Sequence, residues 1–285
     1  MRRVVLGIVF YLLAIVVVSA VLTPLAAWGT EALGWHFPVK RVFNRTIMVS
    51  ALLLLWPLVK FLRINSWRQC GLAVSGPALA RVPWWLALGI FTIVVLYLGQ
   101  WLAGVVVWDA HLVWYKPLGF LLTGLLVGVL EELMFRGVFF LAFASEDKGR
   151  TLLLAVLGSA FFATAHFIKA QNPAGEVNWL TGWLIWAEMG SHFLVWQELV
   201  MRWLTLFWTG MMLCAVSWRY GTIWAAVGLH AGWVLALKTA EGLVRTQAAS
   251  GSVWFAPSVL EGLWPALLLM VMCGVTLTVK FSREG

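Results

Sequence analysis

The chain has 285 residues, of which 62% are hydrophobic and 11% are charged. Soluble domains carry about a quarter charged residues and under half apolar ones. This composition therefore excludes a soluble globular domain, a disordered chain and a disulfide-stapled secreted module. The formal charge of +8 comes mostly from Lys and Arg in short segments between apolar runs. In such segments Lys and Arg determine the orientation of the chain in the membrane and contact lipid headgroups. We therefore expect a lipid bilayer as partner and no nucleic acid.

Long apolar runs predict an all-α fold, a polytopic membrane bundle of about eight transmembrane helices. In chain order, we expect spans at 4–23, 46–62, 83–107, 118–141, 151–168, 203–217, 222–238 and 260–279. The first run follows Arg2 and Arg3 but is longer than the apolar part of a typical signal peptide, so we interpret it as a span. The three cysteines are far apart and predict neither a disulfide framework nor a metal site.

The segment 178–200 differs from the spans because its aromatic residues recur at three- and four-residue steps. Glu188, His192 and Glu198 lie off this aromatic stripe. One aromatic face and one polar face are typical of a helix at the membrane interface. Glu188 and His192 are also four residues apart, so a shared metal is an alternative interpretation.

The spans divide the chain into an N-terminal part at 1–117, a core of four spans at 118–238 and a C-terminal loop and span at 239–285. The loops between them carry slightly more Lys and Arg on one side. By the positive-inside rule, this asymmetry predicts that both termini are cytoplasmic.

The fourth predicted span carries three ionisable groups within six residues: Glu131, Glu132 and Arg136. Such groups are costly inside a membrane and persist when they are paired, hydrated or functional. Glu132 and Arg136 are four residues apart, so they lie on one helical face and can form an ion pair. Glu131 points about 100° away round the helix. It is therefore the candidate to accept a proton from water as a general base.

Two histidines in other spans, His166 and His230, are candidates for its partners. Small residues surround both, and small residues let membrane helices approach closely. A cluster of one glutamate and two histidines around a water is therefore feasible. Phe162 precedes His166 by one turn, so it can pack against the imidazole or the wall of the site. From spacing alone, an enzyme and an ion-coupled transporter remain equally open, beside a purely structural role.

Several hydrolase classes are excluded. The sequence has no His-Glu-x-x-His motif of zinc proteases and no Gly-x-Ser-x-Gly nucleophile elbow. The two aspartates, Asp109 and Asp147, fall outside the spans and cannot form an intramembrane aspartyl pair.

At Glu131-Glu132-x-x-x-Arg136, Phe162-x-x-x-His166 and His230, the sequence resembles the family of CAAX-protease and bacteriocin-processing (Abi) intramembrane proteases, related to the Ras-converting type of CAAX prenyl protease. The resemblance covers about 118–238. It implies hydrolysis of a peptide bond within the membrane. By this resemblance Glu131 and His166 activate a water and His230 helps to hold the oxyanion. Glu132 and Arg136 brace the helix.

The resemblance allows two forms of the reaction. We expect a metal-free glutamate mechanism without a cofactor, and the alternative is Zn²⁺ held by Glu131, His166 and His230 with one open position. One position departs from the family pattern. Val234 stands where the family has Asn or Asp four residues after the last histidine. The oxyanion site is then incomplete or uses another donor.

The leading hypothesis is an endopeptidase that cleaves a peptide or membrane-protein substrate. A prenylated CAAX peptide, a bacteriocin leader and a sorting tail all fit. The alternatives are a transporter component with the same Glu/His cluster and a non-proteolytic immunity or scaffold protein. By analogy with the family, the protein is expected in the bacterial inner membrane. The sequence leaves its oligomeric state open.

Overall fold

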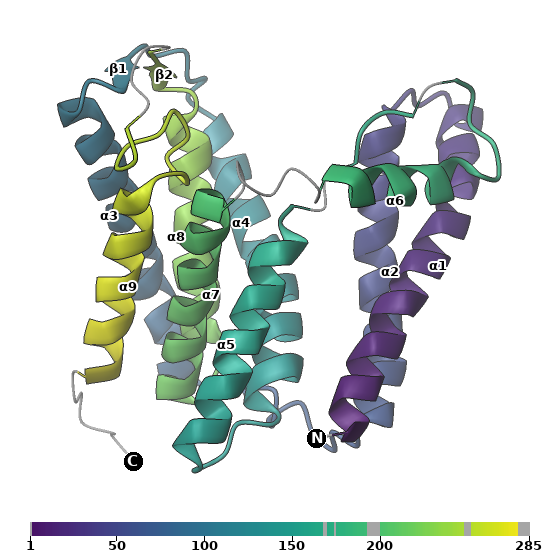
Figure 1. Cartoon of the computed structure of the whole chain (residues 1–285), viewed down its shortest axis with the longest axis horizontal. Coiled ribbons are helices and arrows are strands. Elements are labelled where there is room, and N and C mark those ends of the chain that lie inside the picture. The colour runs from purple at the N-terminus through teal and green to yellow at the C-terminus, as the bar shows by residue number, and fades with distance from the viewer. Residues whose placement is uncertain (1, 168–169, 174, 193–199, 248–251, 279–285) are drawn as a thin grey trace. The chain divides into compact units, whose positions relative to one another are not determined.

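The computed structural model describes residues 2–167, 170–173, 175–192, 200–247 and 252–278 (Figure 1). These residues form two compact units, which are described separately. The first unit comprises 1–65 and 165–198, and the second comprises 66–164 and 199–285. The division at 117 and 238 expected from the sequence stays a prediction.

The all-α prediction is confirmed, because the described residues are mostly helical with one two-stranded sheet. The first unit holds α1 (Arg2–Ala32), α2 (Val39–Phe61) and α6 (Thr181–His192). The second holds α3 (Gly76–Leu102), β1 (Val106–Trp108), α4 (Lys116–Glu132), the π-helix η1 (Leu133–Leu141), α5 (Lys148–Ala165), α7 (Val200–Tyr220), α8 (Trp224–Ala240), β2 (Val244–Thr246) and α9 (Leu263–Thr278).

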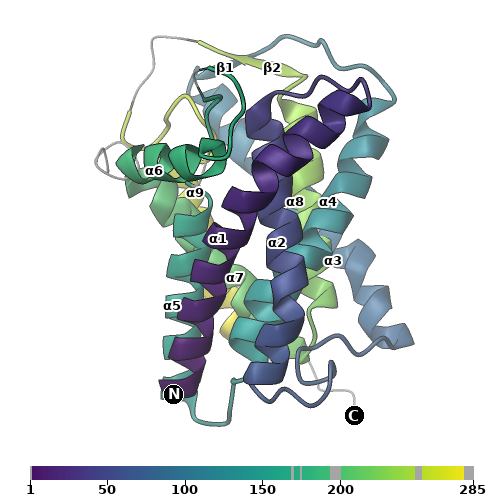
Figure 2. The same cartoon turned by 90° about the vertical axis from the view of Figure 1, so that its right-hand side faces the viewer.

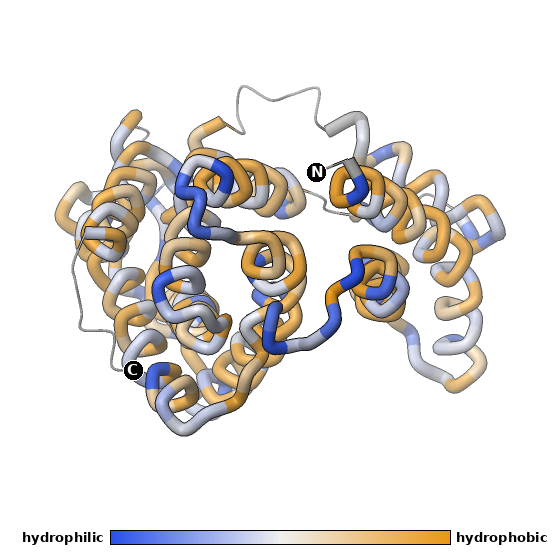
Figure 3. Tube along the Cα trace, turned by 90° about the horizontal axis from the view of Figure 1, so that it is seen from below, coloured by the Kyte–Doolittle hydropathy of each residue, from blue (hydrophilic) through white to orange (hydrophobic). Residues whose placement is uncertain are grey.

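Five helical segments of the described chain are long and apolar enough to cross a membrane: α1, α2, α3, α4 with η1, and α7. The helix α9 is apolar but shorter. Hydrophobic residues dominate along the helices in Figure 3, and many of their large apolar side chains are exposed. Exposed apolar surface of this extent needs lipid around it. The protein is thus a multi-pass membrane protein, while the count of eight spans stays a prediction.

In the first unit, α1 and α2 form a hairpin (Figure 2), and α6 lies across them (Figure 1). Phe43 of α2 and Ile185 and Met189 of α6 form a buried core. The Trp186 indole N–H donates to Ser19 Oγ at 3.0 Å. The apolar face of α6 therefore packs on protein, and its placement at the membrane interface stays a prediction. Residues 193–199 of the predicted helix lie outside the described residues.

In the second unit, α8 is the central helix and packs mainly on α3 and α4. Most residues from Ala225 to Trp233 are buried. Gly228 and Gly232 lie so close to the backbone of α3 that neither position has room for a Cβ atom. The prediction that small residues beside His230 allow close helix contact is confirmed, and this contact fixes the depth of His230 in the bundle.

The prediction that the third span runs to residue 107 is wrong. The helix α3 ends at Leu102, where Gly104 takes φ 70° and its N–H donates to the Trp101 carbonyl. Glycine adopts this left-handed backbone at little cost, so it ends the helix. The chain then forms β1, which pairs antiparallel with β2. The apolar residues of β1 continue the hydrophobic run of α3 in the sequence, which is why hydropathy alone predicts a longer helix.

Candidate active site

The helix α4 continues directly into the π-helix η1 after Glu132. π-Helical segments occur often at functional sites, and this one begins directly after Glu132 and contains Arg136. The Arg136 guanidinium donates to Glu132 Oε1 at 3.2 Å, and both side chains are almost fully buried. The ion pair expected from the four-residue spacing is therefore present within one continuous helical segment.

A second polar contact joins this pair to α8. Nδ1 of His230 lies 2.8 Å from the same Oε1 atom of Glu132. An ionised carboxylate accepts hydrogen bonds only, so Nδ1 carries the proton and donates it. This contact fixes the tautomer of the neutral ring and leaves the lone pair on Nε2. Glu132 thus orients His230 as well as binding Arg136.

Glu131 lies on the other side of the imidazole. Its Oε2 atom is 4.0 Å from His230 Nε2, a separation too long for a direct hydrogen bond. The Glu131 side chain is 32% exposed, whereas its neighbour Glu132 is fully buried. Oε2 itself is buried and has no hydrogen-bond partner among the described residues. The two adjacent carboxylates are therefore in different environments, with Glu132 buried and paired and Glu131 partly exposed.

Groups of η1 itself, of α5 and of α7 surround the Arg136 guanidinium. It lies 4.2 Å from the centre of the Phe162 ring of α5 and 5.7 Å from that of Phe135. It also donates to the Gly210 carbonyl of α7 at 3.4 Å. Phe162, expected near the imidazole or the wall of the site, therefore packs on the arginine. This cation–π contact in a dry site helps to hold the charge in place.

His166 lies half-buried in the turn directly after α5, where the chain passes from the second unit into the first. The second unit itself brings together five predicted site residues: Glu131, Glu132, Arg136, Phe162 and His230. The place of His166 beside them stays a prediction.

The structure also bears on the two predicted metal sites. Among the described residues, no group of three His, Cys, Asp or Glu side chains is arranged to hold a metal ion. Of the three residues proposed to hold Zn²⁺, Glu131 and His230 lie together in the second unit, whereas Glu132 is already bonded to Arg136 and His230. Two ligands do not fit a structural or catalytic Zn²⁺ site, which needs at least three. The side chain of His192, from the alternative pair with Glu188, lies outside the described residues.

A cavity of about 590 Å³ in the second unit extends along the same face of α8 as His230. Val234, Leu237, Lys238 and Glu241 line it, at successive helical turns beyond the histidine. Tyr97 and Arg202 also line it, from other helices. The cavity therefore offers space for an extended chain, and Val234, one turn beyond His230, is the lining residue of α8 nearest to the histidine in the sequence.

Sequence reasoning missed the contact between Glu132 and His230, which are 98 residues apart. A local spacing rule pairs Glu132 with Arg136 but cannot predict a partner on another helix. The sequence signal nearest to it was the pair of small residues at Gly228 and Gly232, which indicates close packing but not which carboxylate the histidine meets.

Comparison with known protein families places this cluster in context. Residues 113–236 match the family described as Rce1-like, type II CAAX prenyl endopeptidase. The matched segment contains every residue of the cluster described above as well as His166. No curated protein and no solved structure matches the chain.

Proposed function

Because residues 113–236 match the Rce1-like family of type II CAAX prenyl endopeptidases, we propose that Glu131 and His166 activate a water for peptide hydrolysis. The general activity of this family is that of a membrane-embedded peptidase acting on peptides in the bilayer. Glu131 and His166 are the side chains that we assign to this activity. Its main support is the Glu131 carboxylate, which lies 4.0 Å from His230 and has an oxygen without a hydrogen-bond partner among the described residues.

In the proposed reaction, Glu131 takes one proton from a water while the water oxygen bonds to the carbonyl carbon of the substrate. The carbonyl oxygen becomes an oxyanion. The C–N bond then breaks, and the proton held by Glu131 passes to the leaving amine. One water is consumed, and the products are a carboxylic acid and an amine.

The proposed place of His166 rests on its short distance along the chain from Phe162. Phe162 contacts Arg136, and four residues of helix rise about 6 Å. This short distance supports a place for His166 near the cluster, where its imidazole orients the attacking water.

His230 has two possible tasks, which depend on its protons. With Nδ1–H bonded to Glu132, the neutral ring presents an acceptor at Nε2 and can hold a water. The imidazolium donates from both nitrogens and can hold the oxyanion. We propose the second task, with Glu132 and Arg136 fixing the ring.

The metal-free mechanism is our proposal, because among the described residues no group of three His, Cys, Asp or Glu side chains could hold a metal ion. The alternative is Zn²⁺ held by Glu131, His230 and His166.

The test uses the full chain, purified into phosphatidylcholine nanodiscs, and a farnesylated peptide ending in a CAAX sequence, with mass spectrometry of the products. We expect cleavage after the prenylated cysteine by the wild type and by Glu146→Gln, a control in an exposed loop. Glu131→Gln is expected to lose at least about a thousandfold in kcat with an unchanged melting temperature. Full cleavage by Glu131→Gln would overturn the assignment.

Two further measurements distinguish the metal-free from the zinc mechanism and the peptidase from the transporter and the scaffold. Cleavage that persists in EDTA and phenanthroline supports the metal-free mechanism, whereas loss restored by Zn²⁺ contradicts it. The wild type is also tested on a CAAX peptide, a bacteriocin leader and a membrane-protein tail. Cleavage of none of them, together with proton transport across the vesicle membrane, would favour the transporter. If Glu131→Gln and His166→Ala also keep full biological function, the protein is a scaffold.

A further inference from the structure

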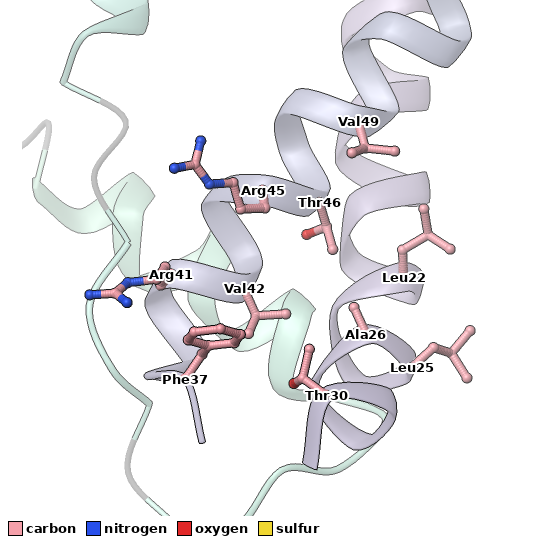
Figure 4. Close-up of a pocket in the computed structure, with 10 residues that line it drawn as sticks. All are labelled: Leu22, Leu25, Ala26, Thr30, Phe37, Arg41, Val42, Arg45, Thr46 and Val49. Carbon is pink, nitrogen blue, oxygen red and sulfur yellow. The ribbon is translucent and has the colours of Figure 1, made fainter. Parts of the chain in front are cut away.

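The first unit contains a cavity of about 600 Å³ between α1 and α2, separate from the residues proposed for catalysis (Figure 4). The residues that line it are Leu22, Leu25, Ala26, Thr30, Phe37, Arg41, Val42, Arg45, Thr46 and Val49. Eight of these ten are uncharged, two are arginines, and none is acidic. The cavity is therefore apolar with a purely positive charge.

Its polarity changes along the helices. Arg41 and Arg45 lie in the first two turns of α2, which begins at Val39. Val49 lies one turn deeper on the same helix, and Leu22 lies eight residues before Thr30 on α1. Eight residues span about 12 Å of helix. The cationic end of the cavity is thus at the end of a span, at headgroup depth, and its apolar end lies toward the middle of the bilayer.

The two guanidinium groups are available for a ligand. Arg41 and Arg45 are four residues apart, so they lie on one face of α2. Figure 4 shows both guanidinium groups extending to the same side, at the rim of the cavity and away from Leu22 and Leu25. Both are exposed, and neither forms an ion pair within the described residues. Arg41 lies over the Phe37 ring at 5.8 Å, a contact that restricts its side chain without neutralising its charge.

The apolar part of the cavity is also open. Leu25, Phe37 and Val49 are each at least 45% exposed, although they line a recess of the protein. In a chain that crosses a membrane, such surface is covered by acyl chains. An occupant must therefore combine a negative group at headgroup depth with a hydrocarbon chain that reaches toward the bilayer centre.

We propose that this cavity is a binding site for an anionic phospholipid of the surrounding bilayer, with its phosphate between Arg41 and Arg45 and one acyl chain along Leu22, Leu25 and Val49. Arginine binds phosphate through several parallel N–H···O bonds, which a zwitterionic lipid with a bulky choline satisfies less well. Basic pockets at the ends of membrane helices bind anionic headgroups for the same reason. Occupation would stabilise the hairpin of α1 and α2.

The test measures which lipids the purified full chain retains. The protein is placed in nanodiscs of equal parts phosphatidylcholine and phosphatidylglycerol, released, and examined by native mass spectrometry. We expect phosphatidylglycerol to be retained in excess. The double variant Arg41→Gln with Arg45→Gln is expected to lose this excess by about tenfold or more, given the usual contribution of two basic residues near anionic lipid.

Three controls make the result specific. Lys60→Gln removes a cation from the other end of α2 that does not line the cavity, and its retention is expected to equal that of the wild type. The pair Arg41→Lys with Arg45→Lys is expected to retain an intermediate amount. Inorganic phosphate is expected not to displace the lipid, because it lacks the acyl chain.

Several outcomes would overturn the proposal. These are equal retention of the two lipids by the wild type, unchanged retention by the glutamine double variant, or an equal loss in Lys60→Gln. Displacement by phosphate alone would assign the arginines to a soluble anion. Since both arginines are exposed, the double variant is expected to fold, which its helical circular dichroism checks.

Discussion

Nδ1 of His230 and Nη1 of Arg136 meet at the same oxygen of Glu132, at 2.8 and 3.2 Å. One buried carboxylate thus connects the α4–η1 helix with α8 and fixes the imidazole ring between itself and Glu131. Carboxylates that hold a histidine in this way commonly determine its orientation and tautomer. The two adjacent glutamates therefore have different tasks, which substitution can separate.

The first prediction concerns Glu132→Gln. This change keeps the shape of the side chain but leaves Arg136 buried without a counter-charge. Breaking a buried ion pair costs about 3–5 kcal/mol, so we expect a clearly lower midpoint of thermal unfolding in detergent. Glu131→Gln is the matched control, because Glu131 is partly exposed and outside this ion pair. Equal midpoints for the two variants would contradict the division of roles.

Local spacing was sufficient to predict the Glu132–Arg136 ion pair, because both residues lie on one helical segment. The contact between Glu132 and His230 depends on the relative depth of two helices that are far apart in sequence. No periodicity encodes that depth directly. The depth of α8 is set by its glycines, which pack on α3. The sequence shows the glycines but not which helix they contact.

The same distinction applies to the fold. Long apolar runs predicted the positions of the five described helices that are long enough to span a membrane, because twenty apolar residues have few other stable arrangements. The end of α3 was predicted wrongly, since Val106 and Val107 continue the apolar run but pair with β2. The hydropathy of a segment indicates that it avoids water but does not indicate whether its backbone is helical or extended. The local sequence signal for the end of α3 was Gly104.

The second prediction tests the contact of α8 with α3. Gly232→Ala would place a methyl group against the carbonyl of Leu86, which belongs to a helix backbone and cannot move aside easily. We expect a loss of about 1–3 kcal/mol in unfolding free energy, as for other overpacked cores. Gly158→Ala on α5 is the control, because no described atom lies within 4 Å of the position that its methyl group would take. There, alanine is expected to be neutral or stabilising by up to about 1 kcal/mol.

The third prediction concerns Cys70, which lies in the loop between α2 and α3. Burial raises the pKa of this thiol to about 11. The folded protein therefore keeps Cys70 protonated at pH 8, and only the thiolate reacts. In a variant with Cys214→Ala and Cys273→Ala, alkylation by iodoacetamide is expected to accelerate about tenfold per pH unit from pH 8 to 10. A rate that levels off near pH 9, as for an ordinary exposed cysteine, would contradict this.

The fourth prediction concerns Val234, which lies one turn beyond His230 on α8 and lines the cavity there. Its side chain offers no hydrogen-bond donor, and it packs close to Gly124 of α4, so a residue of similar size fits best. Val234→Asn keeps nearly the same volume and adds an amide N–H group beside the imidazole.

A single well-placed oxyanion donor typically changes kcat by about a hundredfold or more. If the oxyanion forms on this face of α8, we expect Val234→Asn to raise kcat at least about tenfold with little change in KM. A donor that acts only in the transition state affects kcat and not substrate binding. Val234→Ala is the control, since it opens the same space without adding a donor. An equal gain in both variants would mean that access to the cavity limits the rate, and no gain in either would place the oxyanion elsewhere.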